Sequence, residues 1–356
     1  MNYALIMAGG AGTRLWPLSR EKHSKPSLSL YSDQSMFQIA VERLYPLFTP
    51  EQILVVASRE HIADLAAQVP EIPLQNYIIE PEMRGTASAI GLAAVHLAQR
   101  DPEATMAVLT ADHHIGKPRV FRGVVEAALK LAQQDYIITL GITPTWPSTD
   151  YGYIEQDGVV DQENGFKAYH AVRFVEKPNL NNAQKMLALG NYSWNSGMFI
   201  WKVPVIMAEF QRQMPELHSS LLRIASLIGK PEYEQEMPEI WTKIAKQTID
   251  YGVMEHAERV VVIPADMDWL DVGTWLNLKS LLPMDDKGNS VRGEALLQDC
   301  ENTLVMGSGR IVTGIGLKDL IIVDTPDALM VCDLNHAGQV RELVRLLKEQ
   351  GRQDLV

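Results

Sequence analysis

A glycine-rich segment, AGGAGTR at residues 8–14, directly follows the first apolar run of the chain. Because glycine has no Cβ, such a backbone can lie close to a ligand and turn its N–H groups toward phosphate. Arg14, Arg20 and Lys25 lie in or just behind the segment, and fixed cations beside a glycine loop suit a polyphosphate. A purely structural tight turn does not need these cations. The segment therefore predicts a phosphate or nucleotide cradle.

The loop differs from two common nucleotide-binding motifs. Leu15 stands where the dinucleotide motif has its third glycine. No Gly-Lys-Ser/Thr follows at the spacing of a Walker A loop. A nicotinamide dehydrogenase is therefore disfavoured.

Two aspartates distant in sequence are candidates for a metal site. Asp112 follows the apolar run 106–110, at the carboxyl end of a predicted parallel strand, where α/β sheets bind ligands. Asp271 stands at a second strand-to-helix junction. Mg²⁺ on a nucleotide takes one or two carboxylates, phosphate oxygens and water, so this pair fits a magnesium ion. As an alternative, Asp271 caps the helix that follows it.

Zinc and disulfide frameworks are disfavoured. His113 and His114 point to opposite faces of extended chain, and no third ligand has a recognisable spacing. Cys300 and Cys332 form no C-x-x-C pattern, which favours two reduced thiols.

The first 140 residues alternate β-rich apolar runs with helix-period segments. This pattern predicts a doubly wound, mostly parallel sheet of Rossmann-like α/β type. The predicted strands are Tyr3–Ala8, Ile53–Ala57, Leu74–Glu80, Met106–Thr110 and Tyr136–Gly141.

The pattern changes toward the C-terminus. Residues 144–204 predict an extended insertion that closes over the strand ends, and residues 205–258 are mostly helical. We expect a catalytic domain over residues 1–283 and a small β domain with a closing amphipathic helix over 284–356. That second region has no clean hexapeptide register.

Motifs along nearly the whole chain resemble the sugar-1-phosphate nucleotidyltransferases. The opening GGAGTRLWPL segment carries the family's signature, and its Trp-Pro-Leu-Ser-Arg version at Trp16 to Arg20 is similar to mannose-1-phosphate guanylyltransferases in particular. Seven further motifs follow in the family's order. They are Glu80-Pro81 with Arg84 to Ala87, Ala111-Asp112-His113, Tyr151 to Glu155, Phe174 to Pro178, Trp194 to Phe199, Ile249 to Glu255 and Trp269 to Trp275.

The resemblance implies a reaction: Mg²⁺-dependent transfer of GMP from GTP to α-D-mannose 1-phosphate, which gives GDP-mannose and pyrophosphate. It assigns the metal to Asp112 and Asp271 and catalysis to Arg14, Lys25 and Lys177. It assigns nucleotide binding to Ala8, Gly9, Gly10, Gly12, Thr13, Arg14, Lys25, Arg84, Gly85, Thr86 and Asp112. It assigns sugar phosphate binding to Gly152, Glu176, Lys177 and Asn195.

Residues 176 and 177 also have a simpler interpretation. As strand neighbours, Glu176 and Lys177 face opposite ways and divide the work, the ammonium meeting phosphate and the carboxylate meeting sugar hydroxyls. Without the family context, a solvated surface ion pair explains them equally well.

Two departures from the family pattern affect the nucleotide site. Ser24 precedes Lys25 and Pro26 follows it, whereas family members commonly have proline before the lysine. Gly85 stands where relatives usually have Asn or Asp, which makes base selectivity less secure than reaction type. A guanylyltransferase for another sugar such as a heptose, a thymidylyl- or uridylyltransferase, and a non-catalytic sensor subunit remain alternatives.

Composition and charge limit the partners. The 356 residues carry a net charge of −12, which disfavours nucleic-acid binding. No signal peptide or membrane span is expected, so we expect a cytoplasmic protein. By resemblance, the C-terminal region is a left-handed β-helix that supports a homodimer, and no isomerase region follows Val356.

Overall fold

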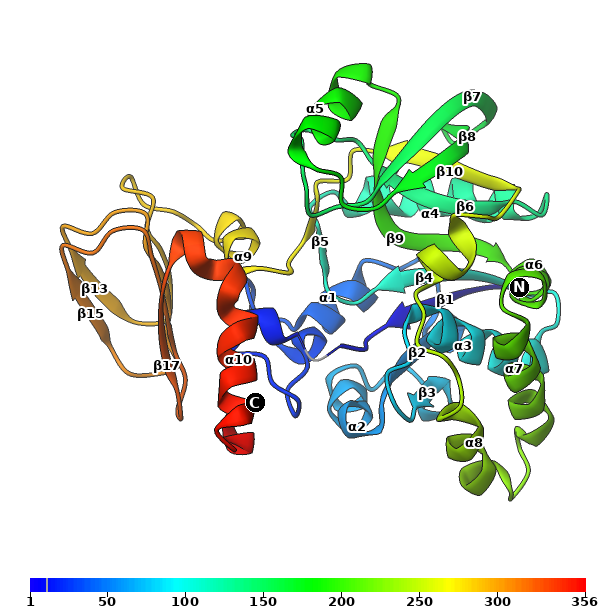
Figure 1. Cartoon of the computed structure of the whole chain (residues 1–356), viewed down its shortest axis with the longest axis horizontal. Helices are drawn as coiled ribbons and strands as arrows, with labels where there is room; N and C mark the ends of the chain where they lie inside the picture. Colours follow the sequence, from blue (N-terminus) through cyan, green and yellow to red (C-terminus); the bar gives the residue numbers. More distant parts are fainter. Residues whose placement is uncertain (11) are drawn as a thin grey trace. The chain divides into compact units, whose positions relative to one another are not determined.

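The chain forms two compact units from interleaved segments. The computed structural model describes residues 1–10 and 12–356, and Figure 1 shows its elements. Unit 1 comprises Met1–Ala8, Val41–Ala111 and Ile115–Trp269. Unit 2 comprises Gly9–Ala40, Asp112–His114 and Leu270–Val356. The cradle residues from Gly9 onward and both predicted metal aspartates therefore belong to the unit that contains the C-terminal residues.

Unit 1 is built on a nine-stranded sheet in the order β3-β2-β1-β4-β9-β6-β10-β8-β7 (Figure 1). β1 pairs in parallel with β2 and β4, β2 with β3, and β6 with β10, whereas β7, β8 and β9 pair antiparallel with their neighbours. The strands are β1 (Asn2–Met7), β2 (Ile53–Ser58), β3 (Tyr77–Glu80), β4 (Thr105–Thr110), β6 (Ile137–Ile142), β7 (Tyr153–Glu163), β8 (Phe166–Val175), β9 (Tyr192–Lys202) and β10 (Val260–Ala265).

Helices cover the sheet and bury its apolar strands. β2 and β4 are continuous apolar runs that are buried along nearly their whole length, as strands covered on both faces must be. The predicted α/β class with a parallel-rich sheet is confirmed. The helices of this unit are α2 (Arg59–Gln68), α3 (Thr86–Arg100), α4 (Pro118–Ala132), α5 (Leu180–Leu189), α6 (Val203–Gln213), α7 (Pro215–Leu227) and α8 (Tyr233–Trp241).

Strand β9 was not predicted from the sequence. It enters the sheet antiparallel between β4 and β6, with Ala107 opposite Ile200 and Ile138 opposite the same residue. Trp194, Phe199 and Trp201 are almost fully buried, so the strand lacks the alternation of polar and apolar residues that marks a half-exposed strand. Residues 144–204 are therefore not only an insertion, because part of them completes the central sheet.

Unit 2 contains short parallel ladders of β-helix type. Ser290 pairs with Leu304, and Leu304 with Ile321, so successive coils span 14 and 17 residues. Unequal coils explain why no fixed sequence period is visible. The strands are β12 (Ser290–Arg292), β14 (Leu304–Met306), β16 (Leu320–Asp324) and the antiparallel β17 (Leu329–Asp333), with β13 (Ala295–Gln298) beside β15 (Val312–Ile315).

The core of unit 2 joins the N-terminal loop to the C-terminal residues. Leu15 and Trp16 pack in one cluster with Trp275, Ile321 and Val344. These residues lie on the turn η1 (Thr13–Leu15) and its C-cap, on α9 (Trp275–Leu281), on β16 and on α10 (Val340–Glu349). A two-stranded pair joins β5 (His113–Ile115) to β11 (Trp269–Asp271). Asp112 directly precedes β5, and Asp271 is the last residue of β11.

We expect His96 to make unit 1 sensitive to acid. Its Nε2 lies 2.9 Å from the Tyr233 hydroxyl, and burial together with the Arg100 charge lowers the pKa of His96 to about 4. Since the unfolded chain takes up this proton near pH 6.5, the free energy of unfolding falls as pH drops from 6.5 toward 4. The loss is at most about 3 kcal/mol, and solvent contact reduces it.

Urea unfolding of His96→Gln at pH 7 and pH 4.5 tests this expectation, and the variant should lose less stability on acidification than the parent chain. His170→Gln, which changes an exposed histidine, is the control. An equal loss in the two variants would contradict the assignment.

Candidate functional site

The glycine loop is held by close backbone contacts in unit 2. Gly12 has φ +58°, and a Cβ there would lie 2.9 Å from the Lys25 Cβ. The Ser19 hydroxyl donates to the Gly12 carbonyl, and the Leu15 amide donates to the same oxygen at 2.9 Å. Only glycine permits this approach, so the loop carries Thr13 and Arg14 on a fixed turn. Ala11 lies outside the described residues.

Lys25 brings the two predicted metal aspartates together. Its Nζ lies 2.7 Å from Asp112 Oδ2 and 3.6 Å from Asp271 Oδ1. The lysine side chain is only 5% exposed, whereas the carboxylates are 34% and 26% exposed. Burial opposes ionisation of Asp112, but the Lys25 ammonium outweighs it, and the pKa of that carboxyl lies well below its usual range. Both carboxylates thus meet at one ammonium with their outer faces open to solvent.

Asp271 does not cap the helix that follows it. The N-cap of α9 is Thr274, whose hydroxyl accepts from the Asn277 amide at 3.2 Å. The Asn277 side chain donates to the Asp271 carbonyl at 2.6 Å and so fixes the backbone of the aspartate. The Asp271 carboxylate is therefore available to a ligand.

Two arginines lie beside this carboxylate pair. Both guanidinium nitrogens Nη1 and Nη2 of Arg14 lie 3.0 Å from the position that a Cβ on Gly273 would take, and Asp271 Oδ2 lies 2.9 Å from it. On α10, burial and the nearby Arg14 charge lower the pKa of Arg341. Within residues 1–10 and 12–356, neither arginine forms an ion pair. Two neighbouring like charges that form no ion pair among the described residues indicate a site for an anion. Arg341 could not be predicted from the sequence. The pattern of an amphipathic helix does not show which of its exposed cations lies near Arg14, more than 300 residues earlier in the chain.

The donor set fits a divalent ion on a nucleotide. Two carboxylates converge on the Lys25 ammonium, and within the described residues no group of three or more His, Cys, Asp or Glu side chains is suited to a metal. Such a sparse set leaves the remaining positions to phosphate oxygens and water, as Mg²⁺ prefers. The histidines have other surroundings: His113 Nε2 lies 3.9 Å from Asp112, and His114 packs edge-to-face on Tyr31.

In unit 1, the Arg84–Thr86 segment is fixed against the strap of residues 244–252. The Gln247 amide donates to the Arg84 carbonyl at 3.0 Å, and the Ile249 amide donates to the Thr86 hydroxyl at 2.8 Å. Gly85 has φ +93°, and a Cβ there would lie 2.2 Å from the Gln247 carbonyl oxygen. The glycine at this departure from the family pattern is therefore required by the backbone of the strap.

The predicted sugar-binding residues of unit 1 also lie together. A Cβ on Gly152 would lie 2.6 Å from Glu176 Oε2 and 3.5 Å from the Asn195 Cβ, so this glycine lets the two side chains converge. These three residues, Asp250 and Tyr251 line one small cavity. The predicted Ala8 directly follows β1, and its amide donates to the Val56 carbonyl at 3.0 Å.

Asp250 is a member of this cluster that sequence reasoning missed. Its Oδ1 accepts from Asn195 Nδ2 at 2.7 Å, which fixes the orientation of that amide. Burial raises the pKa of Asp250, the Asn195 hydrogen bond opposes this, and the Glu176 charge adds to it. The Ile249–Glu255 motif marked the region, but its π-helical turn η5 (Asp250–Met254) gives no periodic signal of which side chain points inward.

Glu176 and Lys177 do not face opposite ways. Lys177 has φ +42°, which breaks the strand alternation, and its Nζ lies 2.5 Å from Glu176 Oε1. The Lys177 side chain is 62% exposed, so its ammonium is open to an incoming anion.

Comparison with known proteins identifies the family of this chain. The nucleotidyl transferase family model matches residues 3–286, and a MannoseP isomerase/GMP-like beta-helix domain matches residues 293–347. Mannose-1-phosphate guanylyltransferases of Escherichia coli strain K12 and Klebsiella pneumoniae are each 35% identical, over 99% and 98% of this chain and 74% of theirs. The chain belongs to the mannose-1-phosphate guanylyltransferase family of nucleotidyltransferases. It spans about three quarters of the length of these relatives.

A solved structure supports this membership. The crystal structure described as mannose-1-phosphate geranyltransferase from Thermus thermophilus matches with a TM-score of 0.86 and 33% identity. The match covers 98% of this chain and 99% of that one. Nucleotidyltransferases of this family generally use a divalent metal ion. In the described part of the chain, every helix is too short or too polar to cross a lipid bilayer.

The strap contact gives a prediction for Gly85. Gly85→Ala adds a Cβ that meets the Gln247 carbonyl and forces a positive φ on alanine, so it should lower the free energy of unfolding by about 2 to 4 kcal/mol. Gly190→Ala is the matched control, because Gly190 also has a positive φ but has no atom within 4 Å of its Cβ position. It should cost only about 1 kcal/mol. Urea unfolding compares the two, and equal losses would show that the strap contact imposes no constraint.

Proposed function

We propose that this enzyme transfers GMP from GTP to α-D-mannose 1-phosphate in the presence of Mg²⁺, with GDP-mannose and pyrophosphate as products. The observation that carries the proposal is the contact of Lys25 with both Asp112 and Asp271 beside the glycine loop, in a member of this family. A cation and two carboxylates on a phosphate-type loop are the parts that a metal-bound triphosphate requires.

The reaction needs no covalent intermediate. A phosphate oxygen of the sugar phosphate attacks the α-phosphorus of GTP, and the bond from that phosphorus to the bridging oxygen breaks as pyrophosphate leaves. Because the acceptor phosphate is already an anion at neutral pH, no general base is required. The barrier is the repulsion between anions and the charge that builds at the α-phosphate.

The residues of unit 2 act on the triphosphate. Asp112 and Asp271 would hold a magnesium ion, which when bound would neutralise phosphate charge and polarise the reacting phosphate. Arg14 and Lys25 balance the remaining negative charge, and we add Arg341 to this set, because its charge lies beside Arg14 with no ion pair among the described residues. The turn around Gly12 directs backbone amides toward the phosphates.

The residues of unit 1 act on the base and on the acceptor. The Arg84–Thr86 segment binds the base of the nucleotide, and Lys177 meets the phosphate of the sugar. The Glu176 carboxylate accepts hydrogen bonds from sugar hydroxyls, and the Asn195 side-chain amide also bonds to them. Gly152 contributes its backbone amide. Asp250 acts as a positioning residue, because it fixes the amide of Asn195.

A pyrophosphate-release assay tests the proposal directly. Each of the four nucleoside triphosphates is paired with mannose, glucose and heptose 1-phosphates, and GTP with mannose 1-phosphate should give the highest kcat/KM. Equal release from other pairs, or none from this one, would overturn the assignment.

Three further assignments complete the proposal. The catalytic domain covers residues 1–283 and the β domain covers residues 284–356. This division is supported by the family matches, which end at 286 and begin at 293.

The enzyme is a cytoplasmic homodimer, and exposed apolar side chains such as Leu296, Ile315 and Val331 on the β domain are available to a partner copy. A solution mass of one chain, 39.8 kDa, would refute the dimer.

Loss of the Lys25 ammonium should slow turnover. In Lys25→Ala the two carboxylates and the triphosphate lose a buried counter-charge, and we expect kcat to fall by about 100-fold or more. Lys185→Ala, which changes an exposed lysine on α5, should leave kcat unchanged. Turnover of Lys25→Ala at the parent rate would remove Lys25 from the catalytic set.

Loss of the Asp271 charge should weaken magnesium binding. In Asp271→Asn one of the two anionic ligands is gone, so the Mg²⁺ concentration at half-maximal rate should rise about 10-fold or more. Thr274→Ala is the control, since it removes the neighbouring N-cap, costs about 1 kcal/mol of stability and should not shift the magnesium titration. An unchanged titration in Asp271→Asn would mean that this residue is only structural.

A further inference from the structure

A cavity of about 670 Å³ lies in unit 1 outside the residues assigned above. It is bounded by the junction of α6 and α7 on one side and by residues 243–252 on the other, and we name it the α6–α7 pocket. Its size is in the range of sites for small organic ligands. Arg212, Met214, Leu217, Lys243, Gln247 and Tyr251 contribute to its lining.

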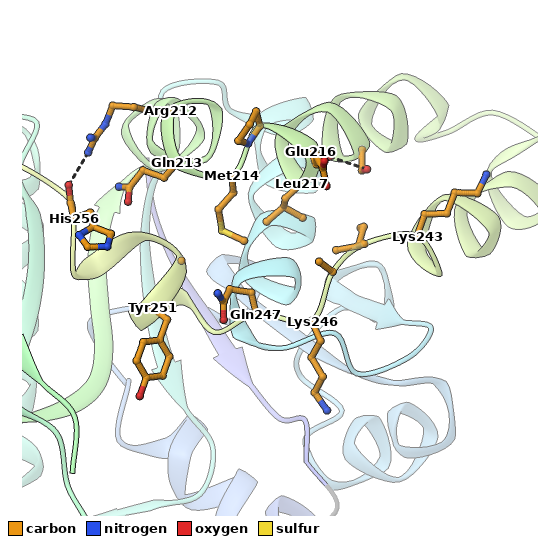
Figure 2. A pocket seen from close by; sticks show the side chains of 15 residues that line it. Arg212, Gln213, Met214, Glu216, Leu217, Lys243, Lys246, Gln247, Tyr251 and His256 are labelled. Atoms are coloured by element: carbon orange, nitrogen blue, oxygen red, sulfur yellow. Dashed lines mark hydrogen bonds between the residues drawn. The ribbon is translucent and has the colours of Figure 1, made fainter. Parts of the chain in front are cut away.

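The lining combines an apolar floor with hydrogen-bonding groups. Figure 2 shows the side chains of Met214 and Gln247 pointing toward one another across the pocket, with Leu217 beside Met214. The Gln213 side chain donates to Glu209 and to the Val253 carbonyl, and its residue lines the pocket together with Gln247. Such a surface suits a flat, polar ring that stacks on Met214 and bonds to side-chain amides.

The rim of the pocket is positively charged in an acidic protein. Lys243 and Lys246 line it together with one carboxylate, Glu216, and with Arg212, which is already paired with Glu209 at 2.7 Å, although the chain as a whole has a net charge of −12. Neither lysine forms an ion pair with any described residue. Figure 2 shows both lysines on the opposite side from Arg212, with their side chains extending away from Met214 and Gln247. This charge favours an anionic ligand.

We propose that the α6–α7 pocket binds a nucleotide, with the base against Met214 and the phosphates at the lysine rim. The ring-binding floor and the cationic rim together match the two parts of that ligand. A simple anion would use only the rim, and an apolar ligand would use only the floor.

The pocket is connected to the assigned sites through its own wall. Tyr251 lines both this pocket and the small cavity of Glu176 and Asn195. A Cβ on Gly252 would lie 2.6 Å from Met214 Sδ, so Met214 packs directly on the backbone of the turn that presents Asp250. On the same strap, Gln247 holds the backbone at Arg84 and Ala87. A nucleotide that presses on Met214 therefore shifts residues 244–252, which two ligand sites share. The readout of this effect rests on the proposed function.

Equilibrium dialysis with GDP tests the site on the full chain. The parent should bind two equivalents, Lys25→Ala should weaken only the equivalent at the triphosphate site, and Ser220→Trp should fill the pocket and remove the other. Lys243→Glu leaves the pocket open and should weaken the second equivalent about 10-fold or more, whereas Lys185→Glu, on exposed α5, should not.

The kinetic consequence is measured separately. In the parent, GDP at the second site should change the KM for mannose 1-phosphate about five-fold, and in Ser220→Trp this change should be absent while kcat without GDP is retained.

The outcomes separate this inference from the proposed function. Binding of only one equivalent of GDP, lost in Lys25→Ala, would refute nucleotide binding at the α6–α7 pocket. Binding of a second equivalent that is unchanged in both Ser220→Trp and Lys243→Glu would refute it as well. A chain without guanylyltransferase activity that still binds GDP in a manner sensitive to Ser220→Trp would refute the proposed function and support the pocket.

Discussion

The pairing of one buried ammonium with two carboxylates is the constraint on which the site depends. Lys25 is nearly inaccessible, and an unpaired lysine at such depth is strongly unfavourable, so its ammonium needs the carboxylates of Asp112 and Asp271 beside it. Two carboxylates at one point repel one another unless a cation lies between them. In this structure the ammonium supplies that charge. If a divalent ion were held by the two carboxylates, it would supply that charge instead, and the Lys25 ammonium would be available to a phosphate oxygen.

The C-terminal residues hold this arrangement in place. The Trp16 indole donates to the Leu355 carbonyl at 2.7 Å, and Arg20 makes two contacts of 2.5 and 2.6 Å with the Asp327 carboxylate. Because these contacts fix both ends of the segment that precedes Lys25, the glycine loop depends on residues more than 300 positions away. A β-helix-like region beside a nucleotidyltransferase loop thus has a structural role at the phosphate site as well as any role in assembly.

Much of this could be predicted from the sequence, because the signals are local. The apolar runs of the parallel strands and the glycine loop are continuous in sequence, and Asp112 directly follows one such run. The rest depends on tertiary contacts. Strand β9 is buried on both faces and shows no alternation, the positive φ of Lys177 turns it toward Glu176, and Arg341 acquires a role only because α10 lies near η1. The grouping of residues 9–40 with the C-terminus also follows from a shared core that no local pattern shows.

Anomalous diffraction from crystals of the enzyme with GTP and Mn²⁺ tests the central claim most directly. One manganese ion should lie about 2.1 Å from carboxylate oxygens of both Asp112 and Asp271, with the Lys25 ammonium moved from between them onto a phosphate oxygen. A manganese ion that binds without Asp271, or a Lys25 that still bridges both carboxylates in the loaded enzyme, would contradict this account.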